Sequence, residues 1–381
     1  MLNYLRDTAT DREITRQPEV WREAAGLVRG HRSDLDAFLG PLLARDDLRI
    51  VLTGAGSSAF VGEIAAPTLR ARLARRVEAV ATTDLVSHPA AHLAEDVPTL
   101  LVSFARSGDS PESGAATELA DRLLGDVRHL VLTCNPDGAL ARAHRDRPAS
   151  FVLLMPERSD DTAFAMTSSF SSMLLSVLLV LLGEDDGAVE AVAEAAEELI
   201  GARADIEASA AREARRIVYL GSGALTGLAR ESALKVLELT AGQVVAYHDS
   251  ALGFRHGPKA VLDGDTLAVV YVSADPHGRR YDEDIVAELR ASLGDDRVLT
   301  VSSQPLPGGA GPGRVLPGLH GLDDAYLAVA YVVFAQLVAL HSSLRLGLAP
   351  DNPFPDGDVN RVVKGVRIHP YPQPCDRKAD Q

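Results

Sequence analysis

Residues 48–66 read LRIVLTGAGSSAFVGEIAA, and residues 215–233 repeat the pattern as RRIVYLGSGALTGLARESA. Each stretch starts with an apolar run typical of a buried strand, passes through a G-x-G turn with small hydroxyl residues, and ends in a run that suits a helix. The similarity of the two stretches is more informative than either one alone, because it indicates that the chain is duplicated.

Shorter apolar runs follow in both halves, and we expect them to form the remaining strands of two sheets. These runs cover residues 99–102, 129–133, 151–155, 267–272 and 298–301. Strands that alternate with helical segments form right-handed βαβ units, so parallel sheets with helices on both faces are expected. The predicted fold class is α/β, with two tandem, doubly wound domains at 1–200 and 201–381. The first domain is expected to carry an N-terminal helical extension.

Three further segments are predicted from composition. The Ala/Glu-rich stretch 186–216 between the halves favours helix over linker. The Pro/Gly cluster 302–313 indicates a surface loop, and the closing segment 349–374 has too many prolines for regular structure. A mostly irregular C-terminal tail on the second domain is the expected result.

The composition excludes several classes of function. A net charge of -15 in 381 residues argues against a nucleic-acid partner, because phosphate backbones are held by basic surfaces. Cys134 and Cys375 are too few and too far apart for a disulfide framework, which favours reduced thiols and a cytoplasmic location. The N-terminus shows no export signal, and the apolar run 173–182 is shorter than the roughly 20 residues of a membrane helix. This run is expected to be a buried helix, and no membrane partner is predicted.

The stretch SFARSGDSPES at 103–113 follows an apolar run and predicts an anion site at a strand end. Amides at the start of a helix carry the positive end of the helix dipole and hold an anion without net basic charge. The second turn would supply the hydroxyls of Ser107 and Ser110, a close backbone approach at Gly108 and the cation of Arg106. The first turn would supply further amides, from Gly54, Gly56, Ser57 and Ser58. The alternative is a pair of Ser/Gly turns that only cap helices. Neither a P-loop nor a dinucleotide motif is present, so a small phosphate is favoured.

The motifs TGAGSSAF, SFARSGDSPES, AMTSSFSSM, ESALKVLELTAG, GFRHGP and VNRVV occur in this order, and with them the chain resembles the sugar isomerase (SIS) family. It is most similar to the double-SIS, AgaS-type amino-sugar-phosphate isomerases and deaminases, over nearly its whole length. The resemblance implies a phosphosugar whose phosphate lies against Ser58, Arg106, Ser107 and Ser110. Ala105 stands where many relatives carry a serine, and Arg106 is expected to compensate.

The stretch ESALKVLE supplies the acid/base groups. Glu231, Lys235 and Glu238 fall at i, i+4 and i+7 and so share one helix face. Moving a proton between neighbouring sugar carbons needs such a carboxylate, although an exposed Glu/Lys stripe is the commoner use of this spacing. The resemblance implies that Glu238 is the catalytic carboxylate and Lys235 its neighbour. Burial would raise the pKa of the carboxylate and the lysine would lower it.

The remaining candidate residues rest mainly on the resemblance. His256 in GFRHGP lies in a Gly/Pro-bounded loop, where a histidine is either solvated or a ligand contact. The resemblance implies that it opens the sugar ring and enters the pocket from a partner subunit, which makes the active unit a homodimer. Lys364 matches a lysine that contacts the open-chain sugar in related synthases. Thr167 and Ser168 would bond sugar hydroxyls or cap the following helix, as would Ser169.

The expected function is isomerisation and deamination of a hexosamine 6-phosphate to a ketose 6-phosphate and ammonia. A lyase that eliminates water from an N-acetylhexosamine 6-phosphate is an alternative that would use the same residues. A sugar-phosphate sensor without turnover is the third. The sequence leaves galacto or gluco configuration and a free or acetylated amine open. Metal-ligand motifs and a glutamine amidotransferase segment are not found, so a reaction without metal or cofactor is predicted.

Overall fold

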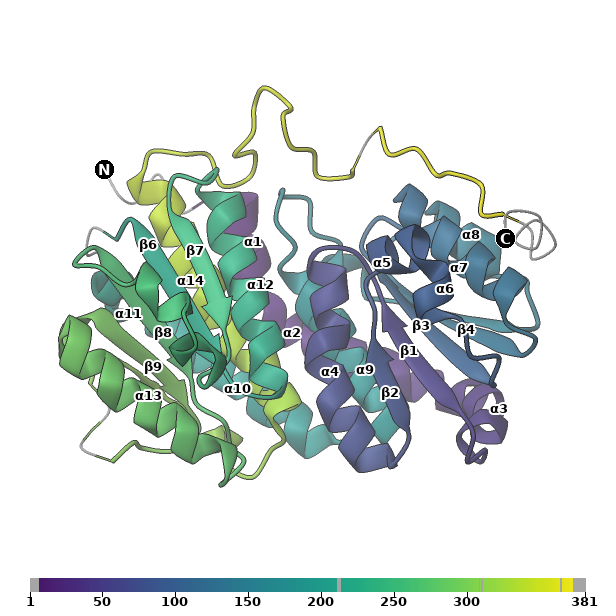
Figure 1. The fold of residues 1–381 in the computed structure, drawn as a ribbon, viewed down its shortest axis with the longest axis horizontal. Helices are drawn as coiled ribbons and strands as arrows, with labels where there is room; N and C mark the ends of the chain where they lie inside the picture. Colours follow the sequence, from purple (N-terminus) through teal and green to yellow (C-terminus); the bar gives the residue numbers. More distant parts are fainter. Residues whose placement is uncertain (1–6, 211–213, 308, 310, 364, 373–381) are drawn as a thin grey trace.

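The computed structural model describes residues 7–210, 214–307, 309, 311–363 and 365–372, and it contains two parallel sheets (Figure 1). The first sheet has the order β2-β1-β3-β4-β5, with β1 (Arg49–Thr53), β2 (Arg76–Ala79), β3 (Thr99–Ala105), β4 (Val127–Thr133) and β5 (Ser150–Leu154). The second has the order β10-β9-β8-β6-β7, with β6 (Arg216–Gly221), β7 (Val245–Asp249), β8 (Thr266–Tyr271), β9 (Val298–Ser302) and β10 (Gly313–Val315). Read from β2 and from β7, the two orders are the same, which confirms the predicted α/β duplication.

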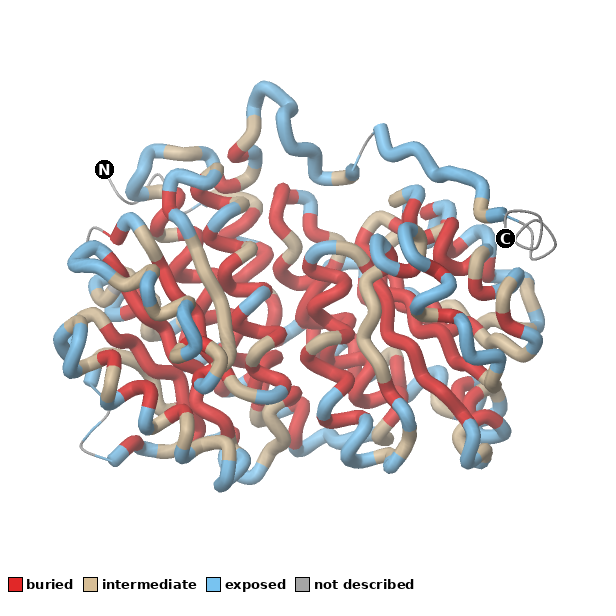
Figure 2. The backbone as a smooth tube through the Cα atoms, in the orientation of Figure 1, coloured by how far each residue is buried: buried red, intermediate tan, exposed pale blue. Residues whose placement is uncertain are grey.

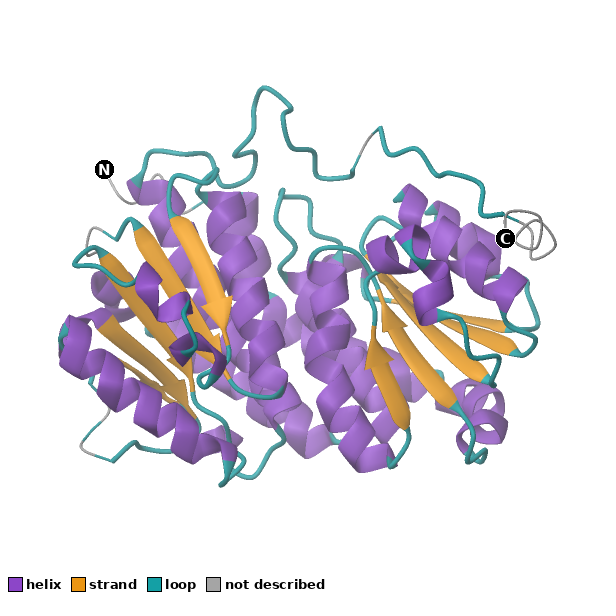
Figure 3. Cartoon of the chain, in the orientation of Figure 1, coloured by secondary structure: helices purple, strands orange, loops and turns teal. Residues whose placement is uncertain are grey.

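Helices cover both faces of each sheet (Figure 3). Those of the first half are α1 (Ala9–Thr15), α2 (Gln17–Gly30), α3 (Arg32–Leu43), α4 (Ser57–Leu73), α5 (Thr82–Ser87), α6 (Pro89–His92), α7 (Pro111–Leu123), α8 (Ala139–His144) and α9 (Ser168–Leu182). Those that follow are α10 (Asp186–Gly201), α11 (Arg203–Ala210), α12 (Ala224–Leu239), α13 (Gly278–Leu293) and α14 (Asp324–Arg345). Short 3-10 helices cover Glu157–Ser159, Gly253–Arg255, Pro258–Val261, Asp295–Arg297 and Pro317–Leu319. The domain boundary near residue 200 stays a prediction.

The two G-x-G turns have the same backbone geometry. Gly56 has φ 57 and ψ −131, and Gly223 has φ 57 and ψ −125. Residues with a Cβ rarely adopt these backbone angles. The first glycine of each turn is required for space: a Cβ on Gly54 would lie 2.5 Å from the Ser58 carbonyl carbon, and one on Gly221 would lie 2.5 Å from the Leu225 carbonyl oxygen. Each turn therefore brings a strand and its helix into close contact.

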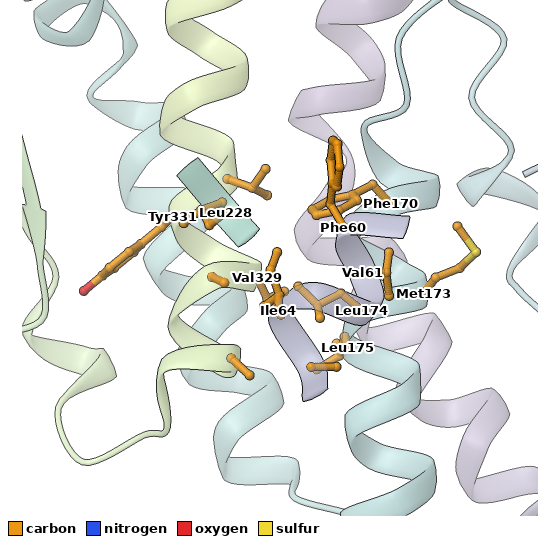
Figure 4. Close-up of a cluster of buried hydrophobic side chains, with 14 of the residues drawn as sticks. Phe60, Val61, Ile64, Phe170, Met173, Leu174, Leu175, Leu228, Val329 and Tyr331 are labelled. Atoms are coloured by element: carbon orange, nitrogen blue, oxygen red, sulfur yellow. The ribbon is translucent and has the colours of Figure 1, made fainter. Parts of the chain in front are cut away.

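The main hydrophobic core lies between the two sheets, where α4, α9, α12 and α14 pack together (Figure 4). Figure 2 shows this central region as the largest block of buried backbone. Helices α4 and α12 approach closely because Gly227 has no side chain, since a Cβ there would lie 2.9 Å from Ile64 Cγ1. The halves thus share one core.

Helix α14 was not predicted from the sequence. It is the one helix in the described ranges that is long and apolar enough to cross a membrane, but 89% of its apolar window is buried inside the molecule. Helix α9, which contains the run 173–182, is also buried, as predicted.

The other sequence predictions for the elements hold with small changes. The seven predicted strands exist, and β3 continues to Ala105, three residues beyond its predicted end. Strands β2, β7 and β10 were not predicted, and β10 begins at Gly313, the last residue of the predicted surface loop. The stretch 186–216 contains α10 and α11 as expected, and the described part of the tail from residue 349 has no helix or strand.

Candidate active site

A cavity of 230 Å³ opens at the carboxyl end of the first sheet. The turn after β1, the turn after β3, the end of α12 and the C-terminal tail contribute its walls. Its lining includes six predicted residues of the two turns and the predicted base: Gly56, Ser57, Ser58, Ser107, Gly108, Ser110 and Glu238. Arg106 also lines it. Parallel sheets bind ligands at this edge, so the turns are placed as an anion site requires.

Two helices begin at this cavity. The 17-residue helix α4 starts at Ser57, which is buried, and the 13-residue helix α7 follows Ser110, its N-cap residue. The intervening loop is fixed by its neighbours: Asn135 Nδ2 donates to the Ser107 carbonyl oxygen at 2.9 Å. Gly108 has φ 68, which favours glycine. The positive ends of both helix dipoles therefore meet at the wall that the hydroxyls line.

Arg106 reaches the cavity but also has structural partners. Its side chain is buried, with 7% of the residue exposed. Nη1 donates to the carbonyl oxygen of Phe164 at 3.0 Å, and Nη2 donates to the carbonyl oxygen of Arg361 at 3.0 Å. Burial lowers the pKa of Arg106, and the nearby Arg361 cation lowers it further. Arg106 thus joins the phosphate turn to the C-terminal tail.

The α12 face holds a lysine between two carboxylates. Lys235 Nζ lies 2.5 Å from Glu238 Oε2 and 3.4 Å from Glu231 Oε1, and it donates to Ser57 Oγ at 3.0 Å. Glu231 and Lys235 are completely buried, whereas the Glu238 side chain is 22% exposed and lines the cavity. An exposed Glu/Lys stripe is therefore excluded.

The charges on this face are coupled. Burial raises the pKa of Glu231 to about 7, although the Lys235 cation opposes the shift. Burial lowers the pKa of Lys235, but the charges of Glu231 and Glu238 outweigh burial and leave that pKa raised. The lysine therefore remains protonated and forms an ion pair with Glu238 at the cavity wall. The sequence pattern placed Glu231 on this helix face. Its spacing did not indicate that Glu231 is completely buried beside Lys235.

The structure places Thr167 and Ser168 away from the cavity. The buried carboxylate of Asp161 accepts hydrogen bonds from the amides of Thr167, Ser168 and Ser169 and from the Thr167 hydroxyl. The Ser168 hydroxyl donates to the Glu13 carbonyl oxygen at 2.7 Å. Neither residue is among those that line the cavity, and their sugar contacts stay a prediction. The capping alternative does not describe them either, because Thr167 makes no side-chain cap bond and Asp161 accepts from the first amides of α9. No local pattern singled out Asp161.

His256 is exposed in the loop after β7 and is not among the residues that line the cavity of its own chain. Its predicted role in a partner's pocket stays a prediction. Lys364 lies outside the described residues. The tail residues Asn360 and Arg361 line the cavity, although sequence reasoning did not assign them. The motif VNRVV, which contains both, was the available signal.

The second half has a related crevice of 670 Å³ beside Gly223. Here carboxylates of the chain itself accept hydrogen bonds from the donors that follow β6 and β8. Asp282 accepts from the Ser222 hydroxyl and the Ser273 amide, and Asp324 accepts from the Ser273 hydroxyl and the Ala274 amide. Burial raises the pKa of Asp282 to about 6. The hydrogen-bond donors beside the second turn are therefore already bound to carboxylates of the chain itself. The negative charge of these carboxylates makes this turn unsuited to phosphate. Among the described residues, no group of three or more His, Cys, Asp or Glu side chains is placed to hold a metal ion.

Comparison with known proteins agrees with this geometry. The SIS domain family model matches residues 42–183. The AgaS protein of Streptomyces coelicolor is 59% identical over 366 residues, which cover 94% of this chain and 95% of the relative. The D-galactosamine-6-phosphate deaminase AgaS of Escherichia coli is 45% identical over 369 residues, 96% of each chain. The crystal structure of tagatose-6-phosphate ketose/aldose isomerase from Escherichia coli matches with a TM-score of 0.89 at 43% identity, over 96% of this chain and 97% of that one.

The chain belongs to the SIS-domain family and, within it, to the AgaS group. The two parallel sheets are its two tandem SIS domains.

Proposed function

We propose that the protein is an isomerase/deaminase that converts D-galactosamine 6-phosphate and water into a ketose 6-phosphate and ammonia. The observation that carries this proposal is the placement of Glu238, with its lysine partner, in the same cavity as the two hydroxyl-rich turns. The names of the AgaS relatives support an amino-sugar phosphate as the substrate class and galactosamine as its configuration.

The mechanism follows from the positions of these groups. The phosphate lies on the turns after β1 and β3, which orients the open-chain sugar along the cavity towards α12. Glu238 takes the proton from C2, and the electron pair forms a C1–C2 enolamine. Return of a proton to C1 gives a ketose imine, and water then replaces the nitrogen and releases ammonia. Lys235 donates a hydrogen bond to Glu238 and so holds its carboxylate in place for this proton transfer.

Ring opening is assigned to His256 of a second subunit in this proposal. The histidine is exposed in a loop next to the edge strand β7, which leaves it accessible to another chain. An imidazole side chain can exchange a proton with the ring oxygen. The active unit would be a homodimer with shared sites.

Incubation of the protein with galactosamine 6-phosphate, glucosamine 6-phosphate and their N-acetyl forms tests the proposal directly. Ammonia and a ketose phosphate should appear fastest from galactosamine 6-phosphate. An ultraviolet-absorbing unsaturated product from an N-acetylated sugar, without ammonia, would identify a lyase. Binding without any product would identify a sensor.

Ser107→Ala and Ser110→Ala should weaken phosphate binding. Each removes one hydroxyl donor to a charged group, and such a bond contributes about 1.5–3 kcal/mol, so KM should rise roughly tenfold or more per variant. Steady-state kinetics on the sugar phosphate would measure this rise. Ser292→Ala, an exposed serine at the end of α13, is the matched control and should leave KM unchanged. Unaltered KM in both turn variants would contradict the phosphate site.

Mixed dimers should recover activity if the sites are shared. A Glu238→Gln chain and a His256→Ala chain are each expected to be nearly inactive alone. One hybrid site would combine an intact Glu238 with an intact His256, so unfolding and refolding the two together should restore about a quarter of wild-type activity. A fully active monomer, or no recovery when hybrid dimers are shown to form, would end this proposal.

A further inference from the structure

Two arginines from distant parts of the chain line the same cavity and are connected to each other. Arg106 follows β3, and Arg361 belongs to the C-terminal tail. The Arg106 guanidinium donates to the Arg361 carbonyl oxygen, and the Arg361 guanidinium donates to the Asp161 carbonyl oxygen. The tail is therefore attached to the body of the protein beside the phosphate turns.

The contacts of Arg361 leave part of its side chain available. Its described contacts, to the Asp161 carbonyl oxygen and at 3.5 Å to Asp160 Oδ1, are both made by Nη2. A guanidinium has five N–H donors on three nitrogens, and its fork geometry matches the oxygens of a phosphate. The Arg361 side chain is 38% exposed and borders the cavity.

Charges of both signs surround the two arginines. The Arg361 cation is close enough to lower the pKa of Arg106, and the carboxylates of Asp161, Glu238 and Asp160 act in the opposite direction. The Asp161 carboxylate also accepts from the amides that start α9. A phosphate dianion would attract both guanidinium groups at once.

The C-terminal tail runs along the top of both halves in Figure 1, and it is attached to the body of the protein on both sides of the residues that line the cavity. Before the cavity, Asp351 accepts from the amides of Ala9 and Thr10 at 2.8 Å, at the start of α1. After it, Arg122 of α7 donates to the Tyr371 carbonyl oxygen at 2.7 Å. The segment 359–363, four of whose residues line the cavity, has no helix or strand hydrogen bonds to hold it and is attached there through Arg361.

We propose that Arg361 is a substrate-binding residue that, together with Arg106, clamps the substrate phosphate and so draws residues 359–363 onto the cavity. This rests on the proposed function only in that the ligand carries a phosphate. Binding would then order the tail segment that lines the cavity.

The first test measures KM for galactosamine 6-phosphate and the inhibition constant of inorganic phosphate. Arg361→Gln should raise both by roughly 10- to 100-fold, with a smaller change in kcat, because a charged hydrogen bond to phosphate is lost. For Arg361→Lys, both constants should lie between those of Arg361→Gln and those of the wild type, because lysine keeps the positive charge but lacks the forked guanidinium. Arg367→Gln makes the same charge change at an exposed position of the same tail and should leave both constants unchanged.

The second test does not depend on turnover. Inorganic phosphate at saturation should slow hydrogen exchange of the amides in 359–363 in the wild type and in Arg367→Gln, but not in Arg361→Gln. An increase in KM without any change in phosphate inhibition would place Arg361 on the sugar and overturn the proposal, as would equal protection in Arg361→Gln and wild type. A wild type that is protected by phosphate but turns over no hexosamine phosphate would reject the proposed function and not this clamp.

Discussion

Glu238→Gln should reduce kcat roughly 10²- to 10⁴-fold while the substrate still binds, the loss typical of a removed general base. Glutamine keeps the shape and hydrogen bonding of the side chain but cannot accept the C2 proton. The Lys235 Nζ at 2.5 Å would still have an oxygen partner, so the helix face should stay in place. Steady-state kinetics on galactosamine 6-phosphate would measure the loss, and binding of the unreacted sugar to the variant would show that the cavity is intact.

Glu194→Gln is the matched control, because Glu194 is exposed on α10, far along the chain from the α12 face. Turnover should be unchanged in this variant. Turnover in deuterium oxide separates the product classes in the wild type: a deaminase leaves deuterium at C1 of the ketose and releases ammonia, whereas a lyase gives an unsaturated sugar and no ammonia. Near-normal turnover of Glu238→Gln on every hexosamine phosphate that the wild type processes would refute the mechanism for both.

Lys235→Met should lower the free energy of unfolding by about 3–5 kcal/mol and abolish turnover. Lys235 is completely buried between Glu231 and Glu238, and removal of one partner from a buried ion pair leaves an uncompensated charge. Methionine fills similar space, so the loss reports on charge and not on a cavity. Chemical denaturation at neutral pH would measure it.

The loss in Lys235→Met should also depend on pH. Burial already raises the pKa of Glu231 to about 7 against the opposing lysine, and without the lysine it rises further. A carboxyl group whose pKa is raised in the folded state stabilises the protein below its unfolded pKa of about 4.3, and that stability is lost as the pH rises through the folded value. The variant should therefore be closest to wild type near pH 5 and fall behind as the pH approaches 8.

The double variant Lys235→Met/Glu231→Gln separates stability from catalysis. A neutral amide replaces the stranded carboxylate, so much of the stability at neutral pH should return, and its pH dependence should flatten. Activity should not return, since Glu238 still lacks its cation. Equal stability of Lys235→Met and wild type across this range would show that the buried charges are not coupled as described.

Most of the fold was predictable because its signals are local and repeated. A G-x-G turn between an apolar strand and a helix requires glycine for its backbone geometry, and this pattern occurs at both Gly56 and Gly223. The strands that were missed are short edge strands, β2, β7 and β10, which are partly exposed and lack an apolar run. Helix α14 was not predicted, although its own apolar composition was the available signal.

The site was predictable only where its residues lie on those repeated elements. Glu238 and Lys235 follow the second turn on one helix face, and the hydroxyls of Ser107 and Ser110 follow a strand. Arg361 lies in an irregular tail, where no periodicity relates a residue to a cavity more than 200 positions earlier in the chain. The hydrogen bonds of Thr167 and Ser168 could not be predicted, because their partner Asp161 is a loop carboxylate outside their own motif.

The carboxylates that fill the second turn also bear on how the enzyme can respond to its substrate. Asp282 and Asp324 accept from donors at the carboxyl end of the second sheet, while the helix that follows this turn brings Glu238 to the cavity of the first half. In the part of the chain that the structure describes, the proposed phosphate site therefore belongs to the first half, although both domains have the same fold. If each chain holds one such site, a sigmoidal dependence of rate on substrate concentration would have to originate in communication between separate chains.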